Sequence, residues 1–489
     1  VLLVSKSRAY QGVVSRDVAI ALNHCREFRS LRGHAEFLTG YMPELGGDVN
    51  GVRSVLESVR DSGLLTPAQH YADLLRQCNS PDAPARSRVF VITCDRPDAV
   101  TRLLESLLAG ANLSRHEGLF LVDDSREEAN IARNREQVED FNTRSPRNMR
   151  HIALAEREDL VGQLVKRLPQ HEDALRFLLD REQWQGEKTY GISRTLCLLL
   201  SVGYRAIVMD DDVICSAIES PYRRPGLRFM DGMCEADFYP SSEAWLKHVR
   251  PCDDDPLSGH LQCLGLGLGQ ALEQLDVAAP AADTLAKSEA KVLQTISPDS
   301  RVLITQNGTL GDPGTGDTAW CFNLTGASLN RLRAGPTAIR DKVTTRQYWM
   351  GWSSPTFTPR ANMSQVTGLD NTALLPPYFP AWRGEDQLFG AMVEYLYPDS
   401  LVLNYPWAVP HLPMEERTGY ITPHPESAGG SGLVEAHVSE HAPDNPDLPL
   451  DMRLASLVQL LREMSHYGDE QLGIAFRVGL AAEQANSAR

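Results

Sequence analysis

The chain has 489 residues, a hydrophobic fraction of 42% and a formal net charge of −16 at pH 7. This length and hydrophobic content allow more than one domain with a sizeable core, and they argue against a disordered chain. The acidic balance argues against a dedicated nucleic-acid binder, which needs a basic surface, although one local pocket can still bind a small anion.

Nine cysteines stand singly along the chain, with no CxxC pair and no paired zinc spacing. The odd number and the chain length favour reduced thiols. We therefore expect a cytoplasmic protein, either free or peripheral to a membrane. The longest apolar runs are far too short to cross a bilayer, so we expect no transmembrane segment.

The chain divides into three expected regions. Residues 13–80 have helical periodicity and end in a Pro/Ser-rich linker, which predicts an N-terminal helical subdomain over residues 1–85. A central domain is expected over 86–425, and a C-terminal helical extension over 426–489 with an amphipathic helix at 451–468 that packs on the core. Residues 141–190 and 216–300 are interpreted as insertions, and the glycine-rich LGLGLGQ within the second as a flexible linker.

From residue 88 the pattern changes to alternating strands and helices. Strands are predicted at 88–94, 118–125 and 205–213, and helices at 99–110 and 194–204. This order implies an α/β fold, with a mostly parallel sheet flanked by helices. Ligands of such sheets bind at the carboxyl ends of the strands, where this chain carries two acidic clusters.

The third strand ends in three consecutive carboxylates, Asp210, Asp211 and Asp212. Three adjacent carboxylates repel one another at the end of a buried strand unless a cation compensates them. Divalent cations take such oxygen ligands and can bridge a protein to a diphosphate. We expect Asp212 to bind a metal ion and Asp210 to share that ion or to reach a ribose. A solvated acidic turn is the alternative.

The second strand ends in VDDS, where Asp123 and Asp124 precede a new helix. A carboxylate at this place can accept hydrogen bonds from a nucleobase or from ribose hydroxyls. Capping of the following helix by Asp124 or Ser125 is an equally open interpretation, because Asp and Ser are common capping residues.

Two later motifs add candidate chemistry. Glu385 and Asp386 begin a predicted helix in RGEDQLFGAMV, where Asp386 could act as the base that deprotonates an acceptor hydroxyl. Helix capping is the alternative for this pair. His411 stands between two prolines in WAVPHLP and could complete a metal shell or be structural.

The order of these segments resembles a GT-A glycosyltransferase of the inverting, family-2-like kind. The resemblance rests on TCDRP, VDDS, GISRTLCLLLSVGY running into MDDDV, FNLTGASLNRL, GED and a late histidine. It covers roughly residues 88–214 and 320–415. It implies a GT-A (Rossmann-like) fold, a nucleotide-sugar donor that is most simply a UDP-sugar, and Mn²⁺ or Mg²⁺ as the cofactor.

The resemblance also implies roles for individual residues. Binding of the nucleotide sugar falls to Thr93, Asp95, Arg96, Asp123, Asp124, Arg194, Asp210, Asp211 and Gly326, flanked by Gly191, Thr325 and Ala327. The implied metal ligands are Asp212, Asp210 and His411. Asp386 matches the catalytic base, and Glu385 is the next candidate.

The sequence departs from that pattern and leaves alternatives open. The third Asp makes the metal assignment ambiguous, and the turn LTGAS lacks a double glycine. A retaining transferase and a non-catalytic nucleotide-sugar or peptide-binding protein of the same fold are the competing functions. The acceptor is a glycan, a small molecule or a peptide. Upstream, residues 47–67 are similar to the helix–turn of winged-helix modules that present leader peptides, with an ordinary helical subdomain as the alternative.

Overall fold

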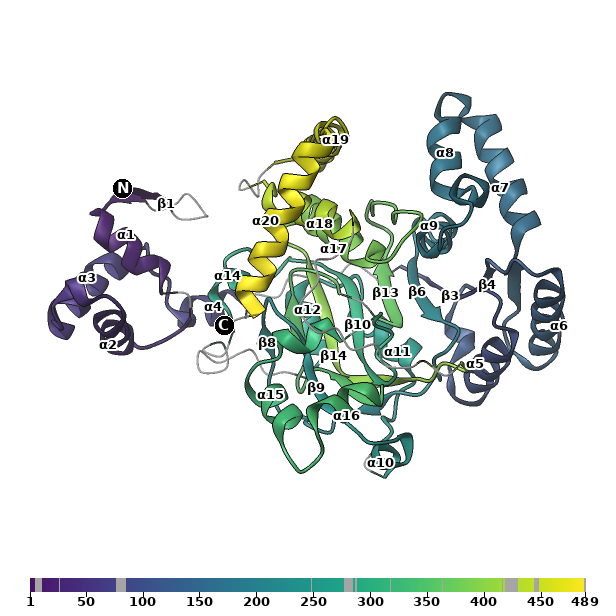
Figure 1. Ribbon diagram of the computed structural model, residues 1–489, viewed down its shortest axis with the longest axis horizontal. Helices are drawn as coiled ribbons and strands as arrows, with labels where there is room; N and C mark the ends of the chain where they lie inside the picture. Colours follow the sequence, from purple (N-terminus) through teal and green to yellow (C-terminus); the bar gives the residue numbers. More distant parts are fainter. Residues whose placement is uncertain are drawn as a thin grey trace.

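The computed structural model confirms an α/β fold with a central sheet flanked by helices (Figure 1). It describes residues 1–4, 11–25, 27–75, 85–247, 249–276, 285, 288–316, 318–362, 364–415, 417, 430–443 and 448–487. The strands of the main sheet are β3 (Ser87–Thr93), β4 (Gly118–Asp123), β5 (Met149–Ile152), β6 (Arg205–Asp210), β7 (Ile218–Glu219), β8 (Arg228–Phe229), β9 (Glu235–Phe238), β10 (Val302–Gly311), β11 (Tyr348–Gly351), β12 (Thr356–Thr358), β13 (Val366–Asp370) and β14 (Leu401–His411).

The main sheet is parallel on one side and mixed on the other. Its strands run in the order β5-β4-β3-β6-β13-β10-β14-β12-β8. The pairs among β5, β4, β3 and β6 are parallel. Strands β4, β3 and β6 are the predicted apolar runs joined through helices, whereas β5, with the sequence MRHI, was not predicted as a strand. Strand β13 is antiparallel to both β6 and β10, so the sheet is more mixed than the sequence indicates.

Helices cover both faces of the parallel half. On one face, α5 (Pro97–Gly110), α6 (Glu128–Arg144) and α11 (Pro256–Leu261) pack on Val89 and Val91 of β3. On the other, α9 (Tyr190–Leu200) and α17 (Glu385–Leu396) pack around Phe90, the residue between those two valines. Successive strand residues point to opposite faces, so a strand buried on both sides requires a continuous apolar run.

The two expected insertions differ in form. Residues 141–190 contribute β5 to the edge of the sheet, so this segment is not wholly an insertion. They also include α7 (Leu154–Arg167) and α8 (Glu172–Leu179), which project from one end of the molecule in Figure 1. Residues 216–300 contribute β7, β8 and β9 to the sheet, as well as α10 (Ser242–Leu246), α11, α12 (Leu268–Gln274) and α14 (Ala290–Leu293). The flexible-linker interpretation of LGLGLGQ is wrong, because Leu264, Leu266 and Leu268 are buried and Leu268 begins α12.

The N-terminal elements lie to one side of the sheet (Figure 1). A hairpin of β1 (Leu2–Val4) and β2 (Gln11–Val13) precedes α1 (Arg16–Asn23), α2 (Leu31–Tyr41) and α3 (Val49–Asp61). These helices share a small core that includes Leu38 and Leu56. The next helix, α4 (Ala68–Leu75), instead packs with Phe229 and Phe357 of the main sheet.

Two of the three C-terminal helices pack against the helix that carries the GED motif. They are α18 (Gly430–Glu440) and α19 (Leu450–Ser465), and Leu457 and Leu460 of α19 share a cluster with Leu388 of α17. The third, α20 (Asp469–Ser487), packs on α18. The predicted amphipathic helix is therefore confirmed. The glycine-rich linker before it lies largely outside the described residues. No helix in the described ranges is long and apolar enough to cross a membrane.

Candidate active site

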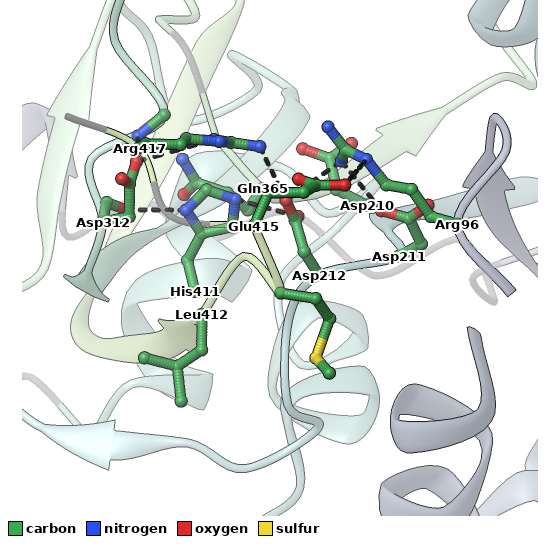
Figure 2. A network of polar contacts seen from close by, with 12 residues as sticks. Arg96, Asp210, Asp211, Asp212, Asp312, Gln365, His411, Leu412, Glu415 and Arg417 are labelled. Atoms are coloured by element: carbon green, nitrogen blue, oxygen red, sulfur yellow. Dashed lines mark hydrogen bonds and ion pairs between the residues drawn. The ribbon is translucent and has the colours of Figure 1, made fainter. Parts of the chain in front are cut away.

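Three strands end together at one edge of the sheet. Asp210 ends β6, His411 ends β14, and Asp312 follows the end of β10. Strands β10 and β14 are parallel and in register at Gly311 and His411, and a bridge joins Val213 to His411. Figure 2 shows that the side chains of Asp210, Asp212, Asp312 and His411 consequently gather in one polar network.

Asp212 is the centre of this network. Its Oδ1 lies 2.9 Å from Nε2 of His411, and its Oδ2 lies 3.2 Å from both Arg96 and Arg417. Burial alone would raise the pKa of Asp212, but the hydrogen bond from His411 and the positive charges around it lower that pKa to about 2. Asp212 is therefore an anion that cationic side chains hold in place.

The other ring nitrogen of His411, Nδ1, is held by a hydrogen bond to the backbone. Nδ1 lies 2.6 Å from the backbone carbonyl oxygen of Asp312, and a carbonyl can only accept, so Nδ1 carries a proton. A histidine oriented in this way directs Nε2 at a metal ion or at a proton. Burial opposes the charge on this ring, but the contact with Asp212 raises the pKa of His411.

The side chains at this site supply only some of the ligands that a divalent cation needs. Within the described ranges, no group of three or more His, Cys, Asp or Glu side chains is arranged to hold a metal ion. Asp212 and His411 nevertheless present one carboxylate and one imidazole, both of which are ligands of divalent metals. A cation at this place would need its remaining ligands from a bound diphosphate or from water.

Asp211 turns toward β3 instead. Its Oδ2 accepts a hydrogen bond from Thr93 Oγ1 at 2.6 Å, and its Oδ1 lies 3.3 Å from Arg96. Burial and the neighbouring charge of Asp212 raise the pKa of Asp211 to about 7. Arg96 also lies 3.4 Å from Glu415, so this single guanidinium joins three carboxylates.

Arg194 joins the sheet edge to the GED motif. It lies 3.1 Å from Asp210 and 3.8 Å from Glu385, and its own Nε is buried without a hydrogen-bond acceptor among the residues that the structure describes. Burial and the neighbouring Asp386 raise the pKa of Glu385 to about 7. Asp386 is half-buried, and its Oδ1 accepts from the backbone N–H of Gln387 at 2.9 Å, a local bond in the first turn of α17.

The acids at the end of β4 are engaged within the protein. Asp123 accepts from Asn134 Nδ2 and lies next to His151 Nε2, both at 2.9 Å. Asp124 is buried and pairs with Arg157 at 2.7 Å and with the hydroxyl of Thr189 at 2.7 Å. Both carboxylates therefore contact side chains of the protein that hold them in place. Their contact with a nucleobase stays a prediction.

Within the described residues, no side chain caps the N-terminus of α6, so neither Asp124 nor Ser125 caps it. Asp95 instead holds the loop that precedes this helix. The carboxylate of Asp95 accepts from the backbone N–H groups of Arg126 and Glu127 and from the side chain of Asn130, at 3.0 to 3.1 Å. Asp95 has a φ of +56°, a region that Asp adopts more readily than most residues. Its carboxylate thus braces the loop after β4.

Two glycines of the implied site occupy different surroundings. A Cβ at Gly191 would lie 1.7 Å from the carbonyl oxygen of Phe379, so only glycine lets the loop before α17 approach α9. Gly326 has a φ of +52° and begins α15 (Gly326–Arg333), which packs with β9. Across the described chain, no hydrogen bond or ion pair joins Thr325, Gly326 or Ala327 to the Asp210–Asp212 cluster.

Sequence reasoning missed several residues of the network. Asp312 forms a buried two-point ion pair with Arg346, with contacts of 2.6 and 2.8 Å, and lies 3.6 Å from Arg417. Thr309 and Gln365 hydrogen-bond beside it. Asp312 had a usable signal, since it follows a strand at its carboxyl end, but β10 itself was not predicted.

No protein-family model matches this chain, and no curated protein matches its sequence. Three solved structures are similar to it at low scores. They are S. aureus TarS 1-349 in complex with UDP-GlcNAc (13% identity, TM-score 0.32, 78% of this chain and 73% of that chain), GalNAc-T7 with UDP, GalNAc and Mn²⁺ (11%, 0.32, 78% and 56%), and the mannosyltransferase PcManGT from Pyrobaculum calidifontis with GDP-Man and Mn²⁺ (10%, 0.30, 86% and 93%). At these TM-scores the likeness carries no argument about the activity of this chain.

Proposed function

We propose that this protein is a glycosyltransferase that moves a sugar from a nucleotide sugar, most simply a UDP-sugar, to an acceptor hydroxyl with inversion. One observation carries the proposal. Carboxylates and cations alternate at the end of β6, where Arg194 joins Asp210 to Glu385 at the start of α17. This arrangement places anion-binding groups next to a candidate base, as transfer from a diphosphate requires.

The donor diphosphate is the ligand for the cations of the network. Arg96 and Arg417 contact Asp212 and keep side-chain exposures of 34% and 25%, so a diphosphate can reach both guanidinium groups. Guanidinium groups bind phosphate oxygens well because two parallel hydrogen bonds fit their planar fork. Asp212 and His411 are the residues that would hold Mn²⁺ or Mg²⁺, and such an ion neutralises charge on a leaving diphosphate.

Asp386 is the base in this proposal. Its Oδ2 has no hydrogen-bond or ion-pair partner within the described chain, whereas Glu385 is buried and lies beside Arg194. The acceptor oxygen attacks the anomeric carbon, the bond from that carbon to the diphosphate breaks, and Asp386 takes the hydroxyl proton. Glu385 then has the role of positioning Arg194 toward the nucleotide side.

Turnover of a panel of UDP-sugars with and without manganese tests the proposal. We expect hydrolysis or transfer that depends on the metal ion, and a product of inverted anomeric configuration. A product of retained configuration would favour the retaining mechanism. Absence of turnover for every nucleotide sugar, together with unchanged melting temperature on adding UDP and manganese, would contradict the proposal.

A further inference from the structure

A cluster of four aromatic rings lies beside the GED motif. Its members are Phe177 of α8, Trp184 at the end of a short 3₁₀ helix (Arg181–Trp184), and Phe379 and Trp382 in the loop before α17. Trp382 stacks on Phe379 with ring centres 5.4 Å apart and meets the edge of Trp184 at 5.8 Å. Phe379 in turn contacts Phe177 and Trp184, so the rings support one another.

The outer members of this cluster face solvent. Trp382 is 46% exposed and Phe177 is 40% exposed. An exposed ring contributes little to the hydrophobic core, because the gain from burial scales with the apolar area removed from water. The exposed part of the Trp382 ring therefore adds little to folding stability.

The backbone holds Trp382 in an unfavourable conformation. Its φ is +66°, which is a sterically crowded region for a bulky side chain. Its backbone N–H donates to the carbonyl of Lys188 at 3.0 Å, and its indole N–H donates to Glu187 at 2.9 Å. The fold thus fixes the position of an exposed indole at a conformational cost, which points to a binding role.

This indole stands at the rim of the proposed active site. It precedes Glu385 by three residues, and Arg383 between them donates to the carbonyl of Gly314 in the loop after β10 at 3.0 Å. On the other side, Gly191 of α9 donates to the carbonyl of Pro380 at 3.2 Å. The loop is therefore fixed to the two walls that also carry Arg194 and Asp312.

We propose that the exposed face of Trp382 binds a pyranose ring of a saccharide acceptor. A pyranose has an apolar C–H face that packs on an aromatic ring and a rim of hydroxyl groups that needs hydrogen-bond partners. Glu187, whose carboxylate accepts from the indole N–H, supplies a charged partner beside the ring, and Lys188 and Arg383 add charge to the two segments that hold it. A lipid acceptor would need a larger continuous apolar surface, and this charged rim disfavours it. The inference rests on the proposed function and names its acceptor class.

Ligand-observed saturation-transfer NMR, without donor or metal, measures this binding directly. The probes are cellobiose, maltose, lactose and chitobiose. We expect saturable binding of at least one of them, with at least a tenfold loss of affinity in Trp382→Gly and a smaller loss in Trp382→Phe. Glycine removes the ring but tolerates the positive φ, so that variant should fold. Phe476→Ala removes a comparably exposed ring, 41% exposed on α20, and should bind like the wild type.

Two outcomes would overturn the inference. Binding of none of the four disaccharides to the wild type is one, and equal affinity in the wild type and a folded Trp382→Gly variant is the other. Because these titrations contain no nucleotide sugar, they report on the indole surface even where donor turnover fails. A wild type that turns over a UDP-sugar but binds no disaccharide would refute saccharide binding by Trp382. The proposed function would still hold.

Discussion

The two acidic clusters at the strand ends look alike in sequence and differ in what surrounds them. At the end of β4, Asp124 pairs with Arg157 at 2.7 Å, where both side chains are at most 6% exposed, and the partly exposed Arg181 lies farther away, at 3.5 Å. At the end of β6, Asp212 pairs with Arg96 and Arg417, whose side chains are 34% and 25% exposed. A carboxylate at a strand end can thus contact a ligand only where the arginines that pair with it are exposed enough to bind the ligand instead. The comparison predicts a loss of stability on the β4 side and a loss of function on the β6 side.

The largest effect is expected at Asp124. Asp124→Asn leaves the buried charge of Arg157 without its anion, and breaking a buried ion pair from one side costs about 3 kcal/mol of unfolding free energy. Urea unfolding measures the change. Asp98→Asn is the matched control, because its pair with Arg133 is exposed and should be worth less than about 1 kcal/mol. Equal stability of both variants would contradict the bracing role of Asp124.

The next effect concerns the base. Asp386→Asn keeps the size and hydrogen bonding of the side chain but cannot accept a proton, so turnover should fall by about 10²-fold or more. UDP affinity should change little, because the base acts on the acceptor. Asn also caps helices well, so a role limited to capping predicts wild-type activity and stability. A near-wild-type rate would transfer the assignment to Glu385.

Substitutions of Asp212 and of Asp211 test which of these two carboxylates binds the metal ion. Asp212→Asn should weaken UDP binding in manganese by about tenfold or more, the scale on which metal sites respond to altered ligand surroundings, while the fold persists. Asp211→Asn should weaken it less, because Asp211 points to Thr93 and away from His411. Calorimetric titration of UDP with and without manganese provides the comparison. Unchanged affinity in Asp212→Asn would remove this residue from the metal site.

Strands β3, β4 and β6 of the parallel half could be predicted because they are unbroken apolar runs, whereas β5 could not, because Arg150 and His151 interrupt its apolar residues. Strand β10 could not, although all ten of its residues are buried. Thr305, Gln306 and Asn307 interrupt its apolar pattern, and only the folded structure supplies their partners, with His260 contacting the first and third at 2.8 and 3.0 Å. Buried polar residues that are satisfied by distant side chains cannot be distinguished from loop residues in one sequence.

The candidate site was predictable in most of its carboxylates and in Arg96 and Arg194, and not in its other cations. Asp210–Asp212 and the GED motif stand at recognisable positions next to predicted elements. Arg417 and Arg346 carry no such signal, because they reach Asp212 and Asp312 from distant parts of the chain. Asp95 shows the converse. The motif position implied a nucleotide contact, while its carboxylate accepts three hydrogen bonds from the loop before α6 and from Asn130 in its first turn.

The smallest effect concerns the pH dependence of stability through Glu385. Its pKa rises from 4.5 to about 7 on folding, so between these values the folded chain binds a proton that the unfolded chain has lost. The unfolding free energy therefore falls as pH rises through this window.

Glu385→Gln abolishes this titration, and its stability relative to the wild type should rise between about pH 5 and pH 7. We expect a gain on the order of 1 kcal/mol, because Arg194 and Asp386 share the change in charge. Urea unfolding of both proteins at pH 5, 6, 7 and 8 measures the difference. Glu158→Gln, at an exposed position of α7, should show no such trend. A stability difference for Glu385→Gln that stays constant across this range would mean that the carboxyl group is solvated or already neutralised by Arg194. The carboxyl group of Glu385 would then titrate like that of a surface glutamate. The contrast between carboxylates with buried partners and carboxylates with exposed partners would not extend to Glu385.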